Sequence, residues 1–271
     1  MRLINRRPDR TAALLLAMLP FVLVLIAYIL GSAARLAENP ADKLLPSLGT
    51  IADAIARVAF NPDARTGDYL LLNDTLATLD RLLTALGLST AIALVVGVTI
   101  GMLPAVRSLL APFVAMVSMV PPLALLPILF IVMGLGEASK VALITIGVTP
   151  FLIRDLAMRV EELPREQIIK AETLGASSWQ LALRVVLPQI APRLIDALRL
   201  SLGPAFLFLI AAEAIAAESG LGYRIFLVRR YLAMDVILPY VVWITLLSVL
   251  MDYALVRLRR ALFPWFGGRT K

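Results

Sequence analysis

The sequence predicts an all-α polytopic membrane protein, a helical bundle with about six transmembrane helices. The 271 residues are 60% hydrophobic and only 17% charged, with a mean hydropathy of +0.88, whereas soluble domains contain about 25% charged residues. The apolar residues are gathered into blocks that lack the period-two alternation of strands, and open sheet edges do not occur in lipid. Six such blocks stand out: 11–30, 82–103, 109–133, 139–153, 194–216 and 236–256.

The first block, 11–30, follows a short basic stretch, residues 1–10. Its apolar run is about 20 residues long, whereas the apolar core of a secretion signal usually has about 7–15 residues. We therefore expect a retained anchor helix.

The segment 31–81 between the first two blocks contains a second kind of helix. Apolar residues recur there at helical spacing: Leu48, Ile51, Ile55 and Val58. This pattern predicts an amphipathic helix that lies on the membrane surface or on the bundle.

Basic residues predict the orientation. If both termini are cytoplasmic, the inner pieces carry 16 Lys and Arg residues and the outer pieces carry 8, as the positive-inside rule requires. The core 82–256 then includes one large cytoplasmic segment, 154–193, and the chain ends in a cytoplasmic tail, 257–271. The net charge of +7 is thus attributed to topology and not to nucleic-acid binding.

The composition also excludes several kinds of chemistry. The chain has no cysteine and no histidine, which rules out disulfides, Cys/His metal sites and Ser-His-Asp triads. None of its four lysines follows a glycine, so it has no P-loop for ATP. We expect no cofactor on this chain and no enzymatic activity of its own, and energy must come from a partner or a gradient.

The central segment predicts two short helices joined at a glycine. The first helix begins near Pro164, Gly175 permits a sharp bend, and a serine cap starts a second helix that carries Trp179. Pro188 and Pro192 are expected to end that second helix. From the residues alone, an interfacial helix that places Trp179 at the lipid headgroups is an equal alternative.

Three ordered blocks carry a family resemblance over roughly residues 70–260. They are "LGASSWQ…VVLP" in the central segment, "VPPLALLPILFIVMGLGEASK" (120–140) and "AAEAIAAESGLGYRIF" (211–226). Together they resemble the permease subunits of bacterial ABC importers, and among those the nitrate, taurine and aliphatic-sulfonate permeases. The family's Glu-Ala-Ala is absent: Ile169, Lys170 and Ala171 stand in its place, with Glu172 one position later.

The resemblance implies a type I ABC importer permease in the bacterial inner membrane. Its partners would be a second permease copy, a solute-binding protein outside the cell, and cytoplasmic ATPase subunits that hold ATP and Mg²⁺. The solute would be nitrate, taurine, a sulfonate or another small nitrogen compound. In this family the central segment forms a coupling helix that docks in a groove of the ATPase. The corresponding residues are Ala171, Glu172, Gly175, Ala176, Ser177, Trp179, Leu187 and Pro188.

A second set of residues is expected along the solute pathway: Pro121, Pro122, Pro127, Glu213, Gly220 and Gly222. Proline kinks free backbone carbonyls that need protein or water, so the three prolines either line the pathway or form a purely structural bend. Glu213 lies in an apolar run, about 28 Å along the fifth block, and a carboxylate there requires water or a partner. It either lines the outer half of the pathway or pairs with Arg224 as a structural clamp.

Two other functional classes are compatible with the residues. A secondary transporter or channel would move solute without ATP, although the sequence shows no inverted repeat. A membrane-embedded enzyme would have to rely on sparse groups such as Glu213 and Asp252.

Overall fold

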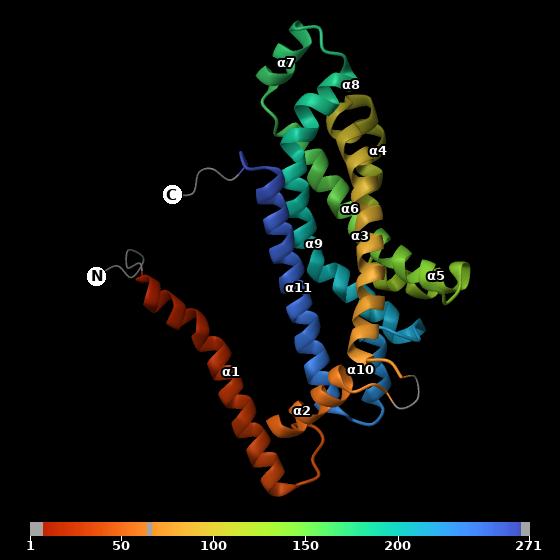
Figure 1. Cartoon of the computed structure of the whole chain (residues 1–271). Helices are drawn as coiled ribbons and strands as arrows, with labels where there is room; N and C mark the ends of the chain where they lie inside the picture. The colour runs from red at the N-terminus through yellow and green to blue at the C-terminus, as the bar shows by residue number, and fades with distance from the viewer. Residues whose placement is uncertain (1–7, 64–66, 267–271) are drawn as a thin grey trace. The chain divides into compact units, whose positions relative to one another are not determined.

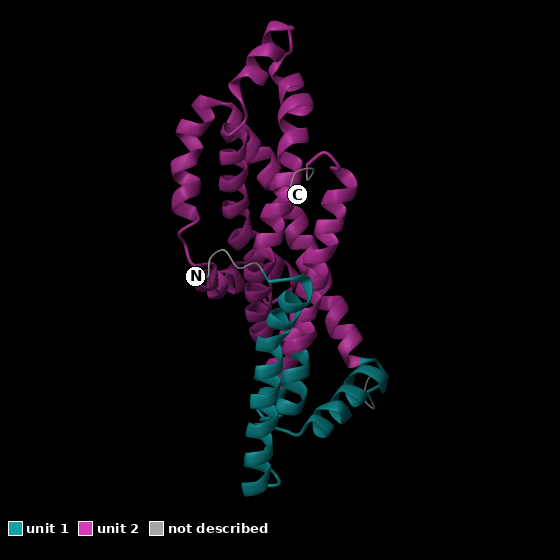
Figure 2. Ribbon diagram, turned by 90° about the vertical axis from the view of Figure 1, so that its left-hand side faces the viewer, with its two compact units in different colours: residues 1–69, 228–240 teal, residues 70–227, 241–271 magenta. Residues whose placement is uncertain are grey.

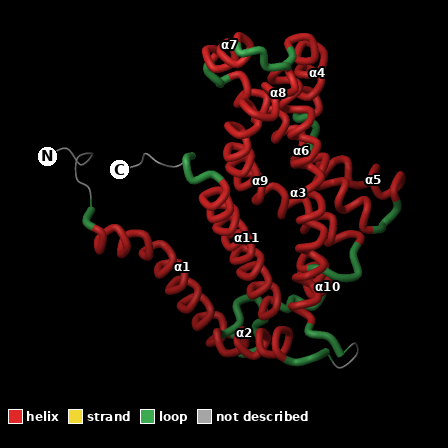
Figure 3. Tube along the Cα trace, turned by 45° about the horizontal axis from the view of Figure 1, so that its top comes forward, coloured by secondary structure: helices red, strands yellow, loops and turns green. Residues whose placement is uncertain are grey.

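The computed structural model describes residues 8–63 and 67–266, and within them the chain forms helices and no strand (Figures 1 and 3). The predicted terminal segments 1–10 and 257–271 therefore lie partly outside the described residues. The helices are α1 (Arg10–Glu38), α2 (Leu48–Ile55), α3 (Leu70–Met102), α4 (Pro104–Val117), α5 (Leu126–Met133), α6 (Glu137–Glu161), α7 (Arg165–Thr173), α8 (Ser178–Leu181), α9 (Leu187–Ala216), α10 (Leu221–Arg229) and α11 (Met234–Leu262).

In the described part of the chain, five helical stretches are long and apolar enough to cross a membrane: α1, α3, α6, residues 178–216 and α11. A sixth candidate consists of α4 and residues 122–133, which are bent by 81° relative to each other. The prediction of about six spans is confirmed. The prediction of one continuous span over 109–133 is wrong, because Pro121 has an extended backbone and neither it nor Pro122 can donate a helical hydrogen bond.

The chain divides into two compact units, shown in Figure 2. The first comprises the described residues of 1–69 and 228–240. Within it, α1 exposes apolar side chains along its length, as a lipid-facing anchor does, and extends beyond the predicted 11–30. The Tyr28 hydroxyl donates to the Pro46 carbonyl (2.7 Å), and the Ser32 hydroxyl is within donating distance of the Leu45 carbonyl (2.9 Å) and the Pro46 carbonyl (3.1 Å), which holds the following loop against α1.

The predicted amphipathic helix is present in the first unit as α2, followed by one π-helical turn, Ala56–Phe60. Ser47 caps its start, with the hydroxyl accepting from the Thr50 backbone N–H at 3.1 Å. Val58 is buried whereas Leu48 is exposed, so only part of the apolar face packs on protein.

The second unit, 70–227 and 241–271, is built around α3, α6 and α9. Helix α3 packs along α6 so closely that a Cβ at Gly97 would lie 2.9 Å from the Leu156 Cβ, and one at Gly101 would lie 2.5 Å from the Val160 Cβ. Glycines at this spacing let two helix backbones approach each other in lipid. Helix α3 begins at Leu70, earlier than the predicted start at residue 82.

The central segment 154–193 differs from its prediction at both ends. Helix α6 continues to Glu161, and the helix that starts at Ser178 runs to Ala216 without ending at Pro188 or Pro192. A π-helical turn over Ala182–Val186 precedes Pro188, and the Leu187 N–H donates to the Ala182 carbonyl across it. Pro188 then falls in the first turn of α9, where its missing N–H is not needed.

Candidate functional site

The turn between α7 and α8 depends on Gly175. Its φ of +82° lies in the left-handed region, which glycine adopts without the strain that a Cβ brings. Two backbone hydrogen bonds close the turn, from the Gly175 N–H to the Glu172 carbonyl (2.9 Å) and from the Ala176 N–H to the Ala171 carbonyl (3.0 Å). These bonds satisfy carbonyls left open at the end of α7, and the predicted bend is confirmed.

Helix α8 begins at a serine cap, as predicted, and the structure shows that Gln180 completes a capping box there. The Ser177 hydroxyl accepts from the Gln180 N–H (3.3 Å), and the Gln180 side chain accepts from the Ser177 N–H (2.9 Å). The Gln189 side chain of α9 donates to the Gln167 side chain of α7 at 2.8 Å. Helix α7 is thus attached to the start of the long helix that follows it.

Helix α7 buries none of its residues. Three large apolar side chains of the α7–α8 segment (165–181) are 56–88% exposed: Ile169, Leu174 and Trp179. Among the other predicted coupling residues, Ala171, Ala176, Leu187 and Pro188 are half-buried, while Glu172 and Ser177 are exposed. Exposed apolar side chains clustered on a largely polar segment indicate a surface that a partner covers.

Glu172, although exposed, also borders a cavity beside the α7–α8 segment. It lines a cavity of about 420 Å³, between the α3–α4 junction, the end of α6 and the α7–α8 segment, together with Arg107, Glu161 and Arg165. An ion pair between Arg107 and Glu161 crosses this region. Glu172 therefore lies at the rim of a cavity that both acidic and basic groups of its own chain line.

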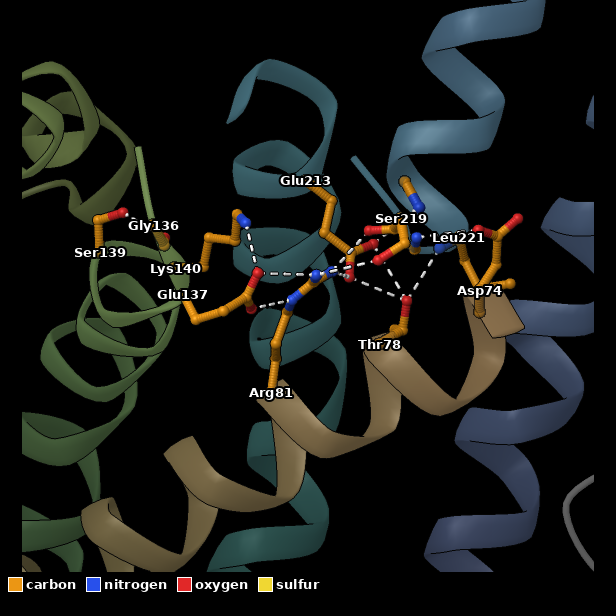
Figure 4. Close-up of polar contacts among 12 residues, drawn as sticks. Asp74, Thr78, Arg81, Gly136, Glu137, Ser139, Lys140, Glu213, Ser219 and Leu221 are labelled. Atoms are coloured by element: carbon orange, nitrogen blue, oxygen red, sulfur yellow. Dashed lines mark hydrogen bonds and ion pairs between the residues drawn. The ribbon is translucent and has the colours of Figure 1, made fainter. Parts of the chain in front are cut away.

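A cluster of buried charges occupies the end of the unit where α6 begins and α9 ends (Figure 4). Glu213 is fully buried there. Its carboxylate accepts from Arg81 Nη1 at 2.7 Å, from the Thr78 hydroxyl at 2.9 Å and from the Gly222 N–H at 2.9 Å. A buried carboxylate is tolerated when a cation and hydrogen-bond donors surround it in this way.

The same residues of α3 hold the loop between α9 and α10. Arg81 donates to the Ser219 carbonyl at 2.8 Å, and the Thr78 hydroxyl accepts from the Leu221 N–H at 2.9 Å (Figure 4). Gly220, with φ +127°, leaves the space that Glu213 fills, because a Cβ there would lie 2.5 Å from the carboxyl carbon of Glu213. The loop is therefore fixed by α3 and Glu213 together.

Comparison with known proteins identifies the family. A family model described as the binding-protein-dependent transport system inner membrane component matches residues 86–267. The chain belongs to this family. It is a permease component of an ATP-driven ABC importer and an inner-membrane protein, as the sequence resemblance implied.

Curated relatives support this assignment. The taurine transport system permease protein of Escherichia coli is 35% identical over 200 residues, which cover 74% of this chain and 73% of that protein. The bicarbonate transport system permease protein of Synechocystis is 26% identical over 73% of this chain and 71% of its own length. A chain of the inward-facing MetNI methionine ABC transporter shares the fold, with a TM-score of 0.64 and 22% identity over 72% of this chain and 96% of that one.

The permease structure corrects one predicted ion pair. Arg224 pairs with Asp74 at 2.8 Å, and the cation beside Glu213 is Arg81. Sequence reasoning missed both partners because 31–81 was assigned to the outer segment, so residues 74–81 were not placed on a span. The signal was present in α3, where Asp74, Thr78 and Arg81 are spaced i, i+4, i+7 on one helix face.

The remaining pathway candidates fall into two groups. Glu213 is in the interior in this structure, and Gly220 and Gly222 pack against it. Pro121 and Pro127 are exposed, and Pro122 is half-buried, at the 81° bend between α4 and α5. A pathway role for the prolines remains a prediction.

Proposed function

We propose that two copies of this permease form one solute pathway and that cytoplasmic ATPase subunits drive it by docking on the α7–α8 segment. A separate solute-binding protein delivers the solute at the opposite side of the membrane. The observation that carries the proposal is the exposure of Ile169, Leu174 and Trp179 on a segment directly continuous with a membrane span. ATP and Mg²⁺ are held by the ATPase, since this chain has no P-loop sequence.

The attachment of α7 to α9 supports a mechanical role for the segment. The Gln167–Gln189 hydrogen bond and the continuous helix from Ser178 to Ala216 leave few points at which a displacement could be absorbed. A rigid-body shift of the ATPase would therefore move α9 and the helices packed on it. Both termini are assigned to the cytoplasm, on the excess of basic residues in the pieces that this orientation places inside.

The solutes in the names of the relatives support a class of solute for this permease. Taurine, aliphatic sulfonates and bicarbonate are the solutes in the names of three of them, and each carries an oxyanion group at neutral pH. Nitrate belongs to the same chemical class. We therefore assign a small solute with an oxyanion group to this permease.

A paired variant tests the docking surface. The double variant Leu174→Ser, Trp179→Ala removes two of the exposed apolar side chains without touching the interior. We expect co-purification of the ATPase to weaken by about tenfold or more, since hot-spot truncations exceed 1 kcal/mol. ATP-driven uptake of taurine or bicarbonate into reconstituted vesicles should fall in parallel, with an unchanged melting temperature.

Phe60→Ser is the matched control, because Phe60 is 73% exposed but lies in the segment assigned to the outer side. It should leave ATPase co-purification unchanged. Normal co-purification and uptake in the double variant would show that the ATPase docks elsewhere.

A further inference from the structure

An ion cluster joins Arg81 of α3 to Glu137 and Lys140 in the first turn of α6, and its cations are buried while one of its anions is exposed. Two cations are almost completely buried: 5% of the Arg81 side chain and 3% of the Lys140 side chain are exposed. The carboxylate that joins them, Glu137, has 62% of its side chain exposed. Lysine and arginine side chains near an apolar surface usually extend their charged ends into water. Here the two cationic side chains are buried, and the carboxylate side chain is the one that reaches water.

The contacts of Glu137 resemble those of a bound ligand (Figure 4). Arg81 presents one edge of its guanidinium, donating from Nε to Oε2 and from Nη2 to Oε1, the latter at 3.0 Å. Lys140 Nζ donates to Oε1 at 2.8 Å. A two-donor guanidinium edge matches carboxylates and other oxyanions. Within residues 8–63 and 67–266, Glu137 is the carboxylate with which Lys140 pairs.

The charge balance shows what would be needed if Glu137 left. Among the described residues, the ion pairs around Arg81 and Glu137 join two basic and two acidic side chains: Arg81, Lys140, Glu137 and Glu213. If Glu137 leaves, two buried cations share the single carboxylate of Glu213, and a buried cation without a partner is strongly unfavourable. One monovalent anion restores neutrality. The N-terminus of the 25-residue helix α6, capped by Gly136 without a side-chain hydrogen bond, adds a further partial positive charge.

We propose that Arg81, Lys140 and the first turn of α6 form a binding site for a small monovalent oxyanion, which Glu137 occupies as a tethered anion in this structure. Because its side chain is largely exposed, Glu137 can rotate into water, whereas the Lys140 side chain is buried and remains beside the vacated position. Arg81 stays in place through its bonds to Glu213 and Ser219. The identification of the ligand with the transported solute rests on the proposed function.

The depth of the site in the membrane is consistent with a position at the outer entrance of the solute pathway. Arg81 lies 21 residues before Met102, the last residue of α3, which corresponds to about 30 Å along the helix. The hydrocarbon core of a bilayer is also about 30 Å thick. In the proposed orientation the site therefore lies at the outer boundary of the membrane, and competition from Glu137 keeps the solute weakly bound so that it can move on.

The test measures binding to the purified chain, without ATPase or uptake. Melting temperatures are recorded in methanesulfonate or bicarbonate and in chloride at equal ionic strength. Glu137→Gln removes the tethered anion, and we expect it to melt lower than wild type in chloride and to be restored by methanesulfonate. Its apparent affinity for methanesulfonate should be about tenfold or more above that of wild type.

Two further variants keep the result decisive. Glu137→Asp retains the charge but is shorter by one methylene, so its methanesulfonate affinity should lie between those of wild type and Glu137→Gln. Adding Lys140→Gln to Glu137→Gln should abolish the selective effect. Glu161→Gln, at the other end of α6, is the control, because its partner Arg107 has a half-exposed side chain that needs no replacement anion.

The proposal is overturned if methanesulfonate and bicarbonate stabilise Glu137→Gln and Glu137→Asp no more than chloride does. That result would make the cluster purely structural and would leave the transport function untouched. Conversely, selective anion binding together with normal ATPase docking but no uptake of any oxyanion would support the site and contradict the assigned solute class.

Discussion

The two ends of the α3–α6–α9 core differ in how completely the chain satisfies its own groups. At one end, Asp74 and Glu213 are fully buried and paired with cations, and α3 fixes the α9–α10 loop. At the other end, α7 buries no residue, and Leu174 and Trp179 are among the most exposed apolar side chains of the described chain. The first end is stabilised by contacts within the chain, whereas the second presents the exposed surface on which we propose that the ATPase docks. Stability should therefore depend on the buried cluster and ATPase coupling on the α7–α8 segment.

The largest effect is expected for Arg81→Met. The change removes the cation beside the fully buried Glu213, and breaking such a pair costs about 3–5 kcal/mol. The melting temperature and the yield of folded chain should fall sharply. Arg107→Met is the control, since its ion pair with Glu161 is more exposed and contributes about 0–1 kcal/mol. A normal melting temperature for Arg81→Met would remove the contrast between the two ends.

A double-mutant cycle sharpens the assignment of pairs within the cluster. Asp74→Asn and Arg224→Gln should show a coupling of about 1–3 kcal/mol in the free energy of unfolding, because the two side chains are in contact. The cycle of Glu213→Gln with Arg224→Gln should show a much smaller coupling. The opposite ranking would restore the Glu213–Arg224 pair that the sequence suggested.

In the α7–α8 segment, Gly175→Leu should impair ATPase coupling with little effect on stability. A Cβ at Gly175 would meet no atom within 4 Å, so a clash of the first side-chain atom with α7 or α8 is not the reason for the expected loss. The cost arises from the left-handed backbone and is about 1–3 kcal/mol. It should distort the turn locally, because α7 has no buried residue to lose.

ATPase co-purification and ATP-driven uptake should therefore fall in Gly175→Leu, while the melting temperature changes little. Gly175→Asn should retain more of both, since asparagine tolerates this backbone region better than leucine. Equal loss in the two variants would contradict a backbone origin.

The smallest effect is expected for Glu172→Lys. Glu172 is exposed and lies at a cavity with both acidic and basic neighbours, and exposed charges contribute about 0–1 kcal/mol. ATPase co-purification should stay within about fivefold of wild type. A loss as large as that of the Leu174→Ser, Trp179→Ala variant would make Glu172 a direct ATPase contact, in the role of the missing family Glu.

The sequence by itself determined the features that depend on local physics. Apolar blocks of about 20 residues without period-two alternation predict membrane helices, because a helix satisfies its own backbone polar groups within lipid. The glycine at 175 and the serine cap predict the bend and the start of α8, since each acts within one helical turn. The ordered family blocks predict the permease function that the family match confirms.

Tertiary structure decided which distant groups meet. Both Arg81 and Arg224 lie on helices at the same end of the core as Glu213. The packing of α3 against α9 decides that Arg81 is the one that pairs with Glu213. The 81° bend after α4 and the continuation of the helix through Pro188 also depend on neighbouring turns and helices. The spacing of Asp74, Thr78 and Arg81 marks a polar face of α3, but it does not indicate which residues 132 or 56 positions away, such as Glu213 and Glu137, lie against Arg81. Such contacts are set by the burial of whole helix faces, which no short stretch of sequence contains.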